Sequence, residues 1–306
     1  MLFTGFVMLT AGLVFSPATG PLPDSEAPLG LSKDKLAQTA QFVLEHHASS
    51  GGYIPQKGSS PSLRATLSAR RSLKLLGVKA PSPEKDILFV ASCVDASGAF
   101  VDRPNEKVTV TLASVGLLLA SDLLMHQNPE YVKLIEFNKR FVLNNAKSFE
   151  EIRMGAAVFD GLGVVPSRKN DWVRQIRATQ SEEGGYGPSG SRLRDTGGVI
   201  AALLRLKEPL AKQERQALIE FLLMGQGKDG GFGVTESAPS ELDSSYRIGR
   251  ALWMLGVMPD AKRMRLFLEK CRTPSGGYSV QPGEEPTLVD TYRALIISSW
   301  LKDIKR

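Results

Sequence analysis

Two kinds of helix-like segment alternate along most of the chain. One kind is amphipathic, with apolar residues three and four positions apart, as in residues 212–226 (KQERQALIEFLLMGQ) and 262–271 (KRMRLFLEKC). The other kind is apolar over much of its surface, as in residues 246–255 (YRIGRALWML) and 291–301 (TYRALIISSWL). An amphipathic helix can cover a core, whereas a helix that is apolar on most sides has to be buried. The pattern therefore predicts an outer layer and an inner layer of helices.

A glycine pair followed by an aromatic residue recurs between these segments. It starts at Gly51, Gly184, Gly230 and Gly276, and a Gly-Ala-Phe variant starts at Gly98. The last three markers are 46 residues apart, the first two are 47 apart, and a gap of 86 leaves room for a unit without its marker, near residue 145. Such a period is typical of a repeated helical unit that buries its apolar face only against its neighbours. We expect the paired glycines to end each outer helix at positive φ and the aromatic ring to fill the gap between units.

The inner helices share an ending. Residues 62–78 (SLRATLSARRSLKLLGV) and 244–257 (SSYRIGRALWMLGV) both close on Leu-Gly-Val, and the same tripeptide occurs in residues 148–165. We interpret these stretches as equivalent inner helices, the third belonging to the unit that lacks its marker. Six helix pairs with an inner and an outer ring then predict an all-α (α/α)6 toroid, with an open solenoid as the alternative.

Composition narrows the class of protein. With 306 residues, 42% of them hydrophobic, the chain can bury one large core or two smaller ones, which excludes a disordered protein. The 38 basic and 32 acidic residues give a net charge of +6. Basic residues such as Arg70, Arg71 and Arg263 have no aromatic residues between them, so we expect solvated helix faces and no nucleic-acid partner, with an acidic-lipid patch as the alternative. We expect the two cysteines, Cys93 and Cys271, to be packing thiols, because no Cys/His cluster occurs.

The N-terminus carries an uncharged run from Leu2 to Phe15, followed by a small-residue pattern that suits cleavage after Ala18. This run is short for a membrane span. We expect residues 1–18 to be a signal peptide or hydrophobic leader, residues 19–32 a linker, and residues 33–306 one toroid domain. A helix packed on the domain is the alternative for the leader. A leader implies an exported or membrane-associated protein, and its absence a cytoplasmic one.

Two of the glycine markers carry a further signature. They read QSEEGGYG at residues 180–187 and QGKDGGFG at 226–233, with a glutamine a few positions before the glycine pair. This resembles the repeat shared by protein prenyltransferase β subunits and the squalene and hopene cyclases, over roughly residues 33–306. The resemblance implies the same all-α toroid, but a shared fold does not determine function.

The sharper resemblance is to the β subunit of protein geranylgeranyltransferase and farnesyltransferase. The family patterns Asp-x-Cys-Tyr and Asp-x-[Phe/Tyr]-His correspond here to residues 243–246 (DSSY) and 290–293 (DTYR). In the family, the Asp, Cys and His bind a zinc ion that lowers the thiol pKa of the substrate cysteine. By position Asp243 is the only family ligand that remains, because Ser245 replaces the Cys and Arg293 replaces the His. A guanidinium group has no lone pair to offer a metal, so the resemblance predicts neither zinc nor another cofactor.

The diphosphate side of the family site also differs. The family places Arg and Lys six and three residues before the zinc Asp, where this chain has Ser237 and Ser240, although Tyr246 is kept. We hypothesise that Arg293 forms an ion pair with Asp243 where the zinc would lie, the alternative being that both point to solvent. The candidate site comprises Asp243, Ser245, Tyr246, Asp290, Tyr292 and Arg293.

Three functions are left open by these patterns. We predict a non-catalytic toroid whose central funnel binds an isoprenoid or other apolar ligand, or whose rim binds a protein partner. The alternative is a transferase of the geranylgeranyl/farnesyltransferase β-subunit type with a rearranged site, which would need zinc and, in the family, a helical α subunit. A third hypothesis is a carbohydrate-active toroid that uses the carboxylates of Asp195, Asp243 and Asp290. The Asp-x-Asp-Asp string of the squalene and hopene cyclases is absent.

Overall fold

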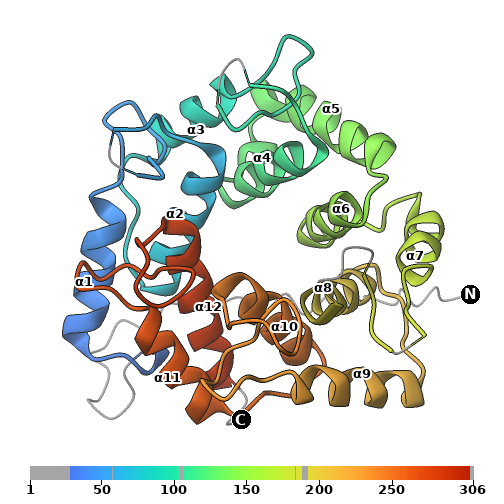
Figure 1. Cartoon of the computed structure of the whole chain (residues 1–306). Helices are drawn as coiled ribbons and strands as arrows, with labels where there is room; N and C mark the ends of the chain where they lie inside the picture. The colour runs from blue at the N-terminus through green and yellow to red at the C-terminus, as the bar shows by residue number, and fades with distance from the viewer. Residues whose placement is uncertain (1–27, 57, 104–105, 183, 188–191, 304–306) are drawn as a thin grey trace, which may run out of the picture.

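The computed structural model describes residues 28–56, 58–103, 106–182, 184–187 and 192–303. Within them, twelve α-helices alternate between an outer and an inner ring (Figure 1). The outer ring consists of α1 (Lys33–Leu44), α3 (Pro83–Ser92), α5 (Pro129–Asn145), α7 (Lys169–Arg177), α9 (Lys212–Met224) and α11 (Ala261–Cys271). The inner ring consists of α2 (Leu63–Leu75), α4 (Val110–Asp122), α6 (Phe149–Gly161), α8 (Arg192–Arg205), α10 (Leu242–Met254) and α12 (Leu288–Asp303). This arrangement confirms the predicted all-α toroid.

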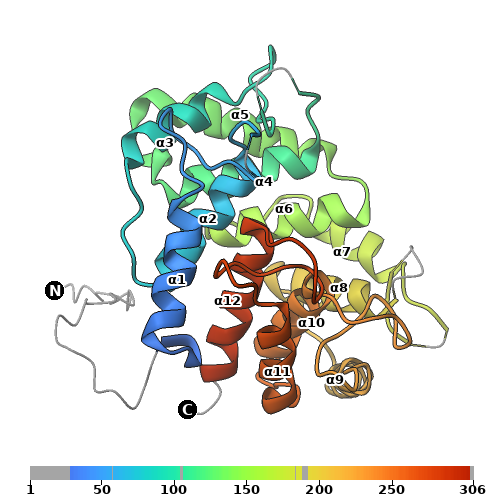
Figure 2. The ribbon, with the colours of Figure 1, turned by 60° about the vertical axis from the view of Figure 1, so that its left-hand side comes forward.

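The ring is closed. Each inner helix packs against the next, and the last one, α12, packs against α2, as Figure 2 shows from the side of the chain ends. The outer ring closes as well, because the Thr39 hydroxyl of α1 donates a hydrogen bond of 2.8 Å to the carbonyl of Gly276, in the last glycine marker. The short 3-10 helix η1 (Pro28–Gly30), at the end of the expected linker, packs on α12. The expected leader lies outside the described residues.

The inner helices begin and end with local signals that the sequence carries. Ser62 and Ser148 cap the first turns of α2 and α6 by accepting hydrogen bonds from backbone N–H groups three residues on. The shared Leu-Gly-Val endings are helix C-caps, in which Gly77, Gly163 and Gly256 take φ values of 69°, 68° and 69°. The same sequence therefore ends three inner helices in the same way.

The glycine markers do not end the outer helices, contrary to expectation. Helix α9 ends at Met224, and the marker lies further on, in a tight turn closed by an isolated β-bridge between Gln226 and Phe232. The glycine is needed for close approach to the next unit, because a Cβ on Gly230 would lie 2.0 Å from the carbonyl oxygen of Arg263 in α11. The aromatic residues of the markers are buried as expected: Tyr53, Phe100, Tyr186, Phe232 and Tyr278.

Among the described residues, no helix has the length and apolar character needed to cross a membrane. The two cysteines are buried, as expected, at the ends of outer helices. Burial raises the pKa of both thiols to about 12, which leaves them protonated and unreactive at neutral pH.

Candidate ligand-binding cavity

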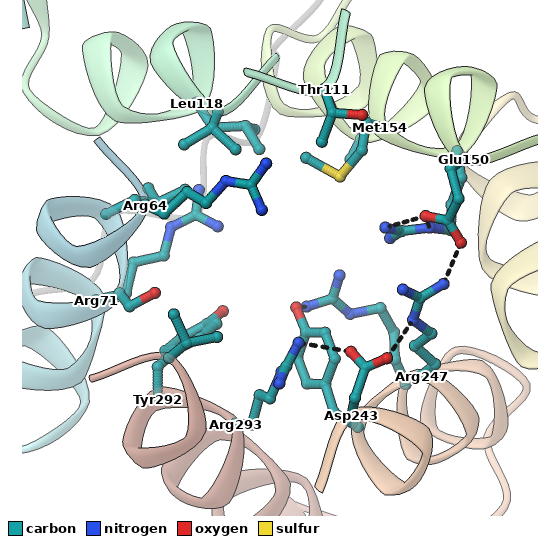
Figure 3. A pocket seen from close by; sticks show the side chains of 18 of the residues that line it. Arg64, Arg71, Thr111, Leu118, Glu150, Met154, Asp243, Arg247, Tyr292 and Arg293 are labelled. Carbon is teal, nitrogen blue, oxygen red and sulfur yellow. Dashed lines mark hydrogen bonds and ion pairs between the residues drawn. The ribbon is translucent and has the colours of Figure 1, made fainter. Parts of the chain in front are cut away.

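The inner ring surrounds a cavity of about 670 Å³, to which all six inner helices contribute side chains (Figure 3). Its volume lies within the range of small-molecule sites in proteins. Apolar side chains gather around α4 and the middle of α2 and α6, with Leu67, Val115, Leu118, Met154 and Ala157, while the ends of α2 and α6 carry charged side chains. The side from α8, α10 and α12 is rich in charged and aromatic side chains. The cavity wall therefore combines an apolar patch with many charged side chains.

Positive charge is in excess on the cavity wall. Three carboxylates line the cavity, those of Glu150, Asp160 and Asp243. Eight arginines line it: Arg64, Arg71, Arg153, Arg194, Arg205, Arg247, Arg250 and Arg293. At neutral pH every arginine carries its charge, so the wall attracts anions.

The inner helices run in the same direction, which gives the cavity two distinct ends. At one end, Asp243 at the start of α10 meets Arg293 at the start of α12. At the other, Arg71 near the end of α2 meets Asp122 at the end of α4, with 2.6 Å between Nε and Oδ2. We call the first end the N-terminal layer; it comprises Arg64, Glu150, Arg153, Arg194, Asp243, Arg247 and Arg293. We call the second end the C-terminal layer; it comprises Arg71, Asp160, Arg205 and Arg250, with the Tyr246 hydroxyl.

In the N-terminal layer, Asp243 is bound by arginines from three helices. Arg293 Nη2 donates to Asp243 Oδ1 over 2.6 Å, which confirms the hypothesised ion pair. Arg247 Nε lies 3.2 Å and Arg194 Nη1 lies 3.7 Å from Oδ2. Burial alone would raise the pKa of Asp243, but Arg293, Arg247 and Arg194 outweigh it and hold the pKa below its usual range. Asp243 is therefore ionised and fully engaged.

The second carboxylate of this layer, Glu150, is engaged in the same way. Arg153 donates to it from Nε and Nη2 at 2.9 and 2.8 Å, and Arg247 Nη1 donates to its other oxygen. Burial opposes ionisation, yet Arg153 and Arg247 lower the pKa of Glu150 below its ordinary value. Arg247 thus bridges Glu150 and Asp243, as the dashed lines in Figure 3 show.

The C-terminal layer is different, beginning with Arg205. Its nearest acid, Asp160, lies 3.8 Å from Nε and is itself paired with Lys207 at 3.0 Å. Arg205 Nη1 is buried and has no hydrogen-bond acceptor among the residues that the structure describes. Burial, together with the neighbouring Arg250, lowers the pKa of Arg205 to about 9. This guanidinium is held in a place where its charge is poorly compensated.

Arg250 is the second cation of this layer. It donates to the Tyr246 hydroxyl, and its guanidinium lies 4.3 Å from the centroid of that ring and 5.6 Å from the Trp300 ring. Within the described part of the chain it forms no ion pair. Burial would raise the pKa of Tyr246, but Arg250, Arg205 and Arg71 act more strongly and lower it. Arg250 therefore has aromatic neighbours in place of an acid.

The structure brings four of the six candidate residues together. Asp243, Tyr246, Tyr292 and Arg293 all line the cavity, and the rings of Tyr246 and Tyr292 meet edge to face with centroids 6.1 Å apart. Asp290 is buried beside the cavity without lining it, and accepts a hydrogen bond of 2.7 Å from Arg293 Nη1. It therefore positions Arg293.

Ser245 has a structural role that the resemblance did not indicate. Its side chain is buried outside the cavity wall, and its Oγ accepts a hydrogen bond of 3.0 Å from the Phe232 N–H, in the glycine marker. In the first unit, the Thr66 hydroxyl accepts a hydrogen bond of 2.9 Å from the Tyr53 N–H in the same way. The hydroxyl at this position therefore fixes the turn of its own unit.

The residues at this position do not suit the zinc ion that the family resemblance implies. The Asp243 carboxylate is engaged by arginines, the Ser245 hydroxyl accepts a backbone N–H, and Arg293 is a cation. Zinc sites in proteins use thiolate, imidazole and carboxylate donors in a tetrahedral set. In the described ranges, no group of three or more His, Cys, Asp or Glu side chains is arranged to hold a metal ion.

Of the three carboxylates considered for sugar chemistry, only Asp243 lines the cavity. Asp195 and Asp290 are buried in the inner ring, with exposed fractions of 2% and 5%. The structure therefore does not assemble the three into an acid-base pair facing a ligand.

Sequence reasoning missed most of the arginines on the cavity wall. The expectation of solvated helix faces holds for Arg263, which is exposed, but is wrong for Arg70 and Arg71. Arg70 binds the fully buried Asp86, and Arg71 lines the cavity, because both lie on an inner helix. The signal was present as charged residues three, four and seven positions apart on helices that were expected to be inside: Glu150, Arg153 and Asp160, and Asp243, Arg247 and Arg250.

Comparisons with known proteins agree with this fold. Residues 24–150 and 152–306 match the family described as Prenyltransferase alpha-alpha toroid domain. The geranylgeranyl transferase type-1 subunit beta of Arabidopsis thaliana is 32% identical over 88 residues, which are 28% of this chain and 24% of that protein. The chain thus spans about a quarter of the curated relative that it matches.

Solved structures show the same architecture at low sequence identity. The type II terpene cyclase MstE of Scytonema, in complex with geranylgeranyl dihydroxybenzoate, superimposes with a TM-score of 0.61 at 13% identity, over 89% of this chain and 97% of that one. A glycosidase in complex with glucose gives 0.54 at 12% identity, over 89% and 99%. Likeness at these identities shows the fold alone.

Proposed function

Because the chain belongs to the prenyltransferase alpha-alpha toroid family, we propose that it binds an isoprenoid-type lipid with an anionic head group in its central cavity, without zinc and without transferring the lipid. The observation that carries this proposal is the composition of the cavity wall, with eight arginines against three carboxylates and an apolar patch of five side chains around α4. A cation-rich wall favours an anionic head, and the apolar patch favours a hydrocarbon tail.

The matched protein of Arabidopsis thaliana supports the choice of lipid. Its name, geranylgeranyl transferase type-1 subunit beta, indicates a geranylgeranyl group as what that protein transfers, although the matched part is a quarter of its length. We therefore take geranylgeranyl diphosphate as the first probe. Neither a protein partner at the rim nor an exported location has a structural observation behind it, and both stay predictions.

The proposed lack of transfer rests on the surroundings of Asp243. A zinc-activated thiolate needs a metal with an open position, and the arginines around Asp243 occupy the place where that metal would be held. The family's diphosphate cations are also replaced, by an exposed Ser237 and by a buried Ser240 that donates to Asp229 over 2.7 Å. A transferase with a rearranged site is the competing function.

The test combines binding, metal content and turnover on the purified protein. We expect saturable binding of geranylgeranyl diphosphate by calorimetry, much weaker binding of the uncharged alcohol geranylgeraniol, less than stoichiometric zinc, and no labelled prenyl group on a cysteine-containing acceptor peptide. Stoichiometric zinc together with turnover would establish the transferase instead. No binding of the diphosphate at any ionic strength would remove the proposed lipid.

A further inference from the structure

We infer that the cavity holds its anionic ligand group at the C-terminal layer, where Arg205, Arg250 and the Tyr246 hydroxyl form a subsite for a phosphate or diphosphate group. This inference rests on the proposed function for the lipid tail but not for the anion. The family resemblance would put the charged group beside Asp243, whereas this inference puts it at the opposite end of the inner ring.

Four of the five arginines in the N-terminal layer are already within ion-pair distance of a carboxylate. Arg153 and Arg247 both bind Glu150, and Arg247 and Arg293 both bind Asp243. The contacts of Arg153 with Glu150, and of Arg247 and Arg293 with Asp243, span 2.6–3.2 Å. Arg293 is bound a second time by the buried Asp290, at 2.7 Å. An incoming anion at this end would have to compete with carboxylates that are already in place. Arg64 is the arginine of this layer that forms no ion pair among the described residues, and it lies at the exposed edge.

The C-terminal layer places a buried donor without an acceptor next to Arg250, which forms no ion pair among the described residues. The N-terminal layer also has such a donor, Arg194 Nε, but it lies 3.7 Å from the Asp195 carboxylate. A guanidinium group carries five N–H donors and no acceptor, so a buried guanidinium needs several oxygen atoms around it. Among the described residues, Arg205 Nη1 has none, and Arg250 donates to the Tyr246 hydroxyl and to no carboxylate. Buried donors that lack partners cost free energy, and a ligand that supplies acceptors recovers it.

The chemistry of these donors selects the class of ligand. Arginine binds phosphate oxygens with two parallel N–H groups, and the oxygens of one phosphate can accept from two arginines and a tyrosine hydroxyl together. The side chain of Arg205 is 14% exposed, which lowers the local dielectric and strengthens its contacts. Either a lipid head group or a free phosphate compound provides this chemistry.

The C-terminal ends of the inner helices also bear on these arginines. The partial negative charge of a helix C-terminus stabilises a cation nearby, and Arg205 is the last residue of α8. This dipole accounts for an arginine cluster that is stable without a ligand, but it supplies no acceptor to Nη1. If the arginines served the helix ends alone, their loss would lower stability and leave ligand affinity unchanged.

The experiment measures affinity for geranylgeranyl diphosphate and for inorganic pyrophosphate by calorimetry in a set of matched variants. Arg205→Gln and Arg250→Gln remove charge from the subsite, and Arg64→Gln removes it from the exposed edge of the N-terminal layer. Arg174→Gln is the control: it changes the net charge by the same amount, but Arg174 lies on the outer helix α7, away from the cavity, and is 76% exposed. Circular dichroism and thermal melting confirm folding, and Tyr246→Phe replaces any variant that does not fold.

We expect each subsite variant to weaken geranylgeranyl diphosphate binding by about 10- to 100-fold, as the loss of a charge-assisted hydrogen bond implies. Arg64→Gln should weaken it by less than about fivefold, and Arg174→Gln should match the wild type. Unchanged affinity in both Arg205→Gln and Arg250→Gln, or a larger loss in Arg64→Gln than in these two, overturns the inference while the lipid proposal stands. Pyrophosphate binding that depends on Arg250, with no gain from the lipid tail, upholds the subsite and overturns the lipid proposal. Binding of neither probe overturns both.

Discussion

Arg247 and Arg250 lie one turn apart on α10 and line the same cavity, yet their surroundings are opposite. Arg247 bridges two carboxylates from two helices. Arg250 has an aromatic ring 4.3 Å from its guanidinium and the hydroxyl of that ring as its acceptor. The comparison teaches that the charge of a residue on the wall does not tell what it can do. An arginine that is already paired holds the ring together, and one that is not paired is available to a ligand.

Helix direction explains why the two layers differ. All six inner helices present their first turns at one end and their last turns at the other. Carboxylates are stabilised at the first turns and cations at the last turns by the helix dipoles. Asp243 and Glu150 lie in first turns, where they attract and neutralise arginines, while Arg205 ends α8. The first-turn end therefore holds Glu150 and Asp243 with the arginines that pair with them, and the last-turn end holds Arg205 and Arg250 beside the pair of Arg71 and Asp122.

Breaking the paired layer should produce the largest loss of stability. In Asp243→Asn the charges of Arg293, Arg247 and Arg194 lose their shared partner, and we expect the free energy of unfolding to fall by about 2 kcal/mol, because the site is only partly exposed. Urea denaturation measures it. The control is Asp34→Asn, an exposed acid in the first turn of α1, which should change stability by less than about 0.5 kcal/mol. Equal effects in the two variants would mean that the layer contributes nothing special.

The same carboxylate predicts a pH dependence. The folded pKa of Asp243 lies below its unfolded value of about 4, so its contribution is complete above that pH and is lost as pH falls through the folded pKa. The difference in unfolding free energy between wild type and Asp243→Asn should therefore be constant from pH 7 to about 4 and shrink below it. A difference that shrank between pH 7 and 5 would contradict the lowered pKa.

Ser245 tests whether the position of the family's cysteine ligand belongs to the cavity at all. Ser245→Ala leaves the buried Phe232 N–H without an acceptor, and we expect a loss of about 1–2 kcal/mol in unfolding free energy. Ligand affinity should not change. Ser245→Thr keeps the hydroxyl, as Thr66 does in the first unit, and should restore most of the stability. A loss of ligand affinity in a folded Ser245→Ala protein would return this residue to the binding site.

The smallest effect concerns the Tyr246 hydroxyl, and it reports on the layer that is not paired. Arg250, Arg205 and Arg71 lower the pKa of Tyr246, so ultraviolet titration should show one tyrosine ionising before the others, and Tyr246→Phe should remove that phase. Arg250→Gln should move the phase to higher pH, and so should a bound anion, because each reduces the positive charge beside the phenol. No shift in either case would show that these cations do not act on Tyr246.

The fold was predictable from the sequence, and the division of the cavity was not. Glycine markers, helix periodicity and the Leu-Gly-Val endings report local structure, which is why they predicted the toroid. The pair of Asp243 and Arg293 was also predictable, since both lie at corresponding ends of adjacent inner helices. The surroundings of Arg250 depend on which side chains four other helices bring near it, and spacing within one helix contains no such information. Ser245 was misassigned to the cavity because a position matched by resemblance does not reveal the direction of a side chain.

The most direct test of the account is a crystal structure of the protein with geranylgeranyl diphosphate. The account predicts the diphosphate within hydrogen-bonding distance of Arg205 and Arg250, the hydrocarbon tail against Leu118 and Met154, and an intact ion pair between Arg293 and Asp243. A diphosphate bound beside Asp243, with that ion pair opened or a metal ion in its place, would contradict it.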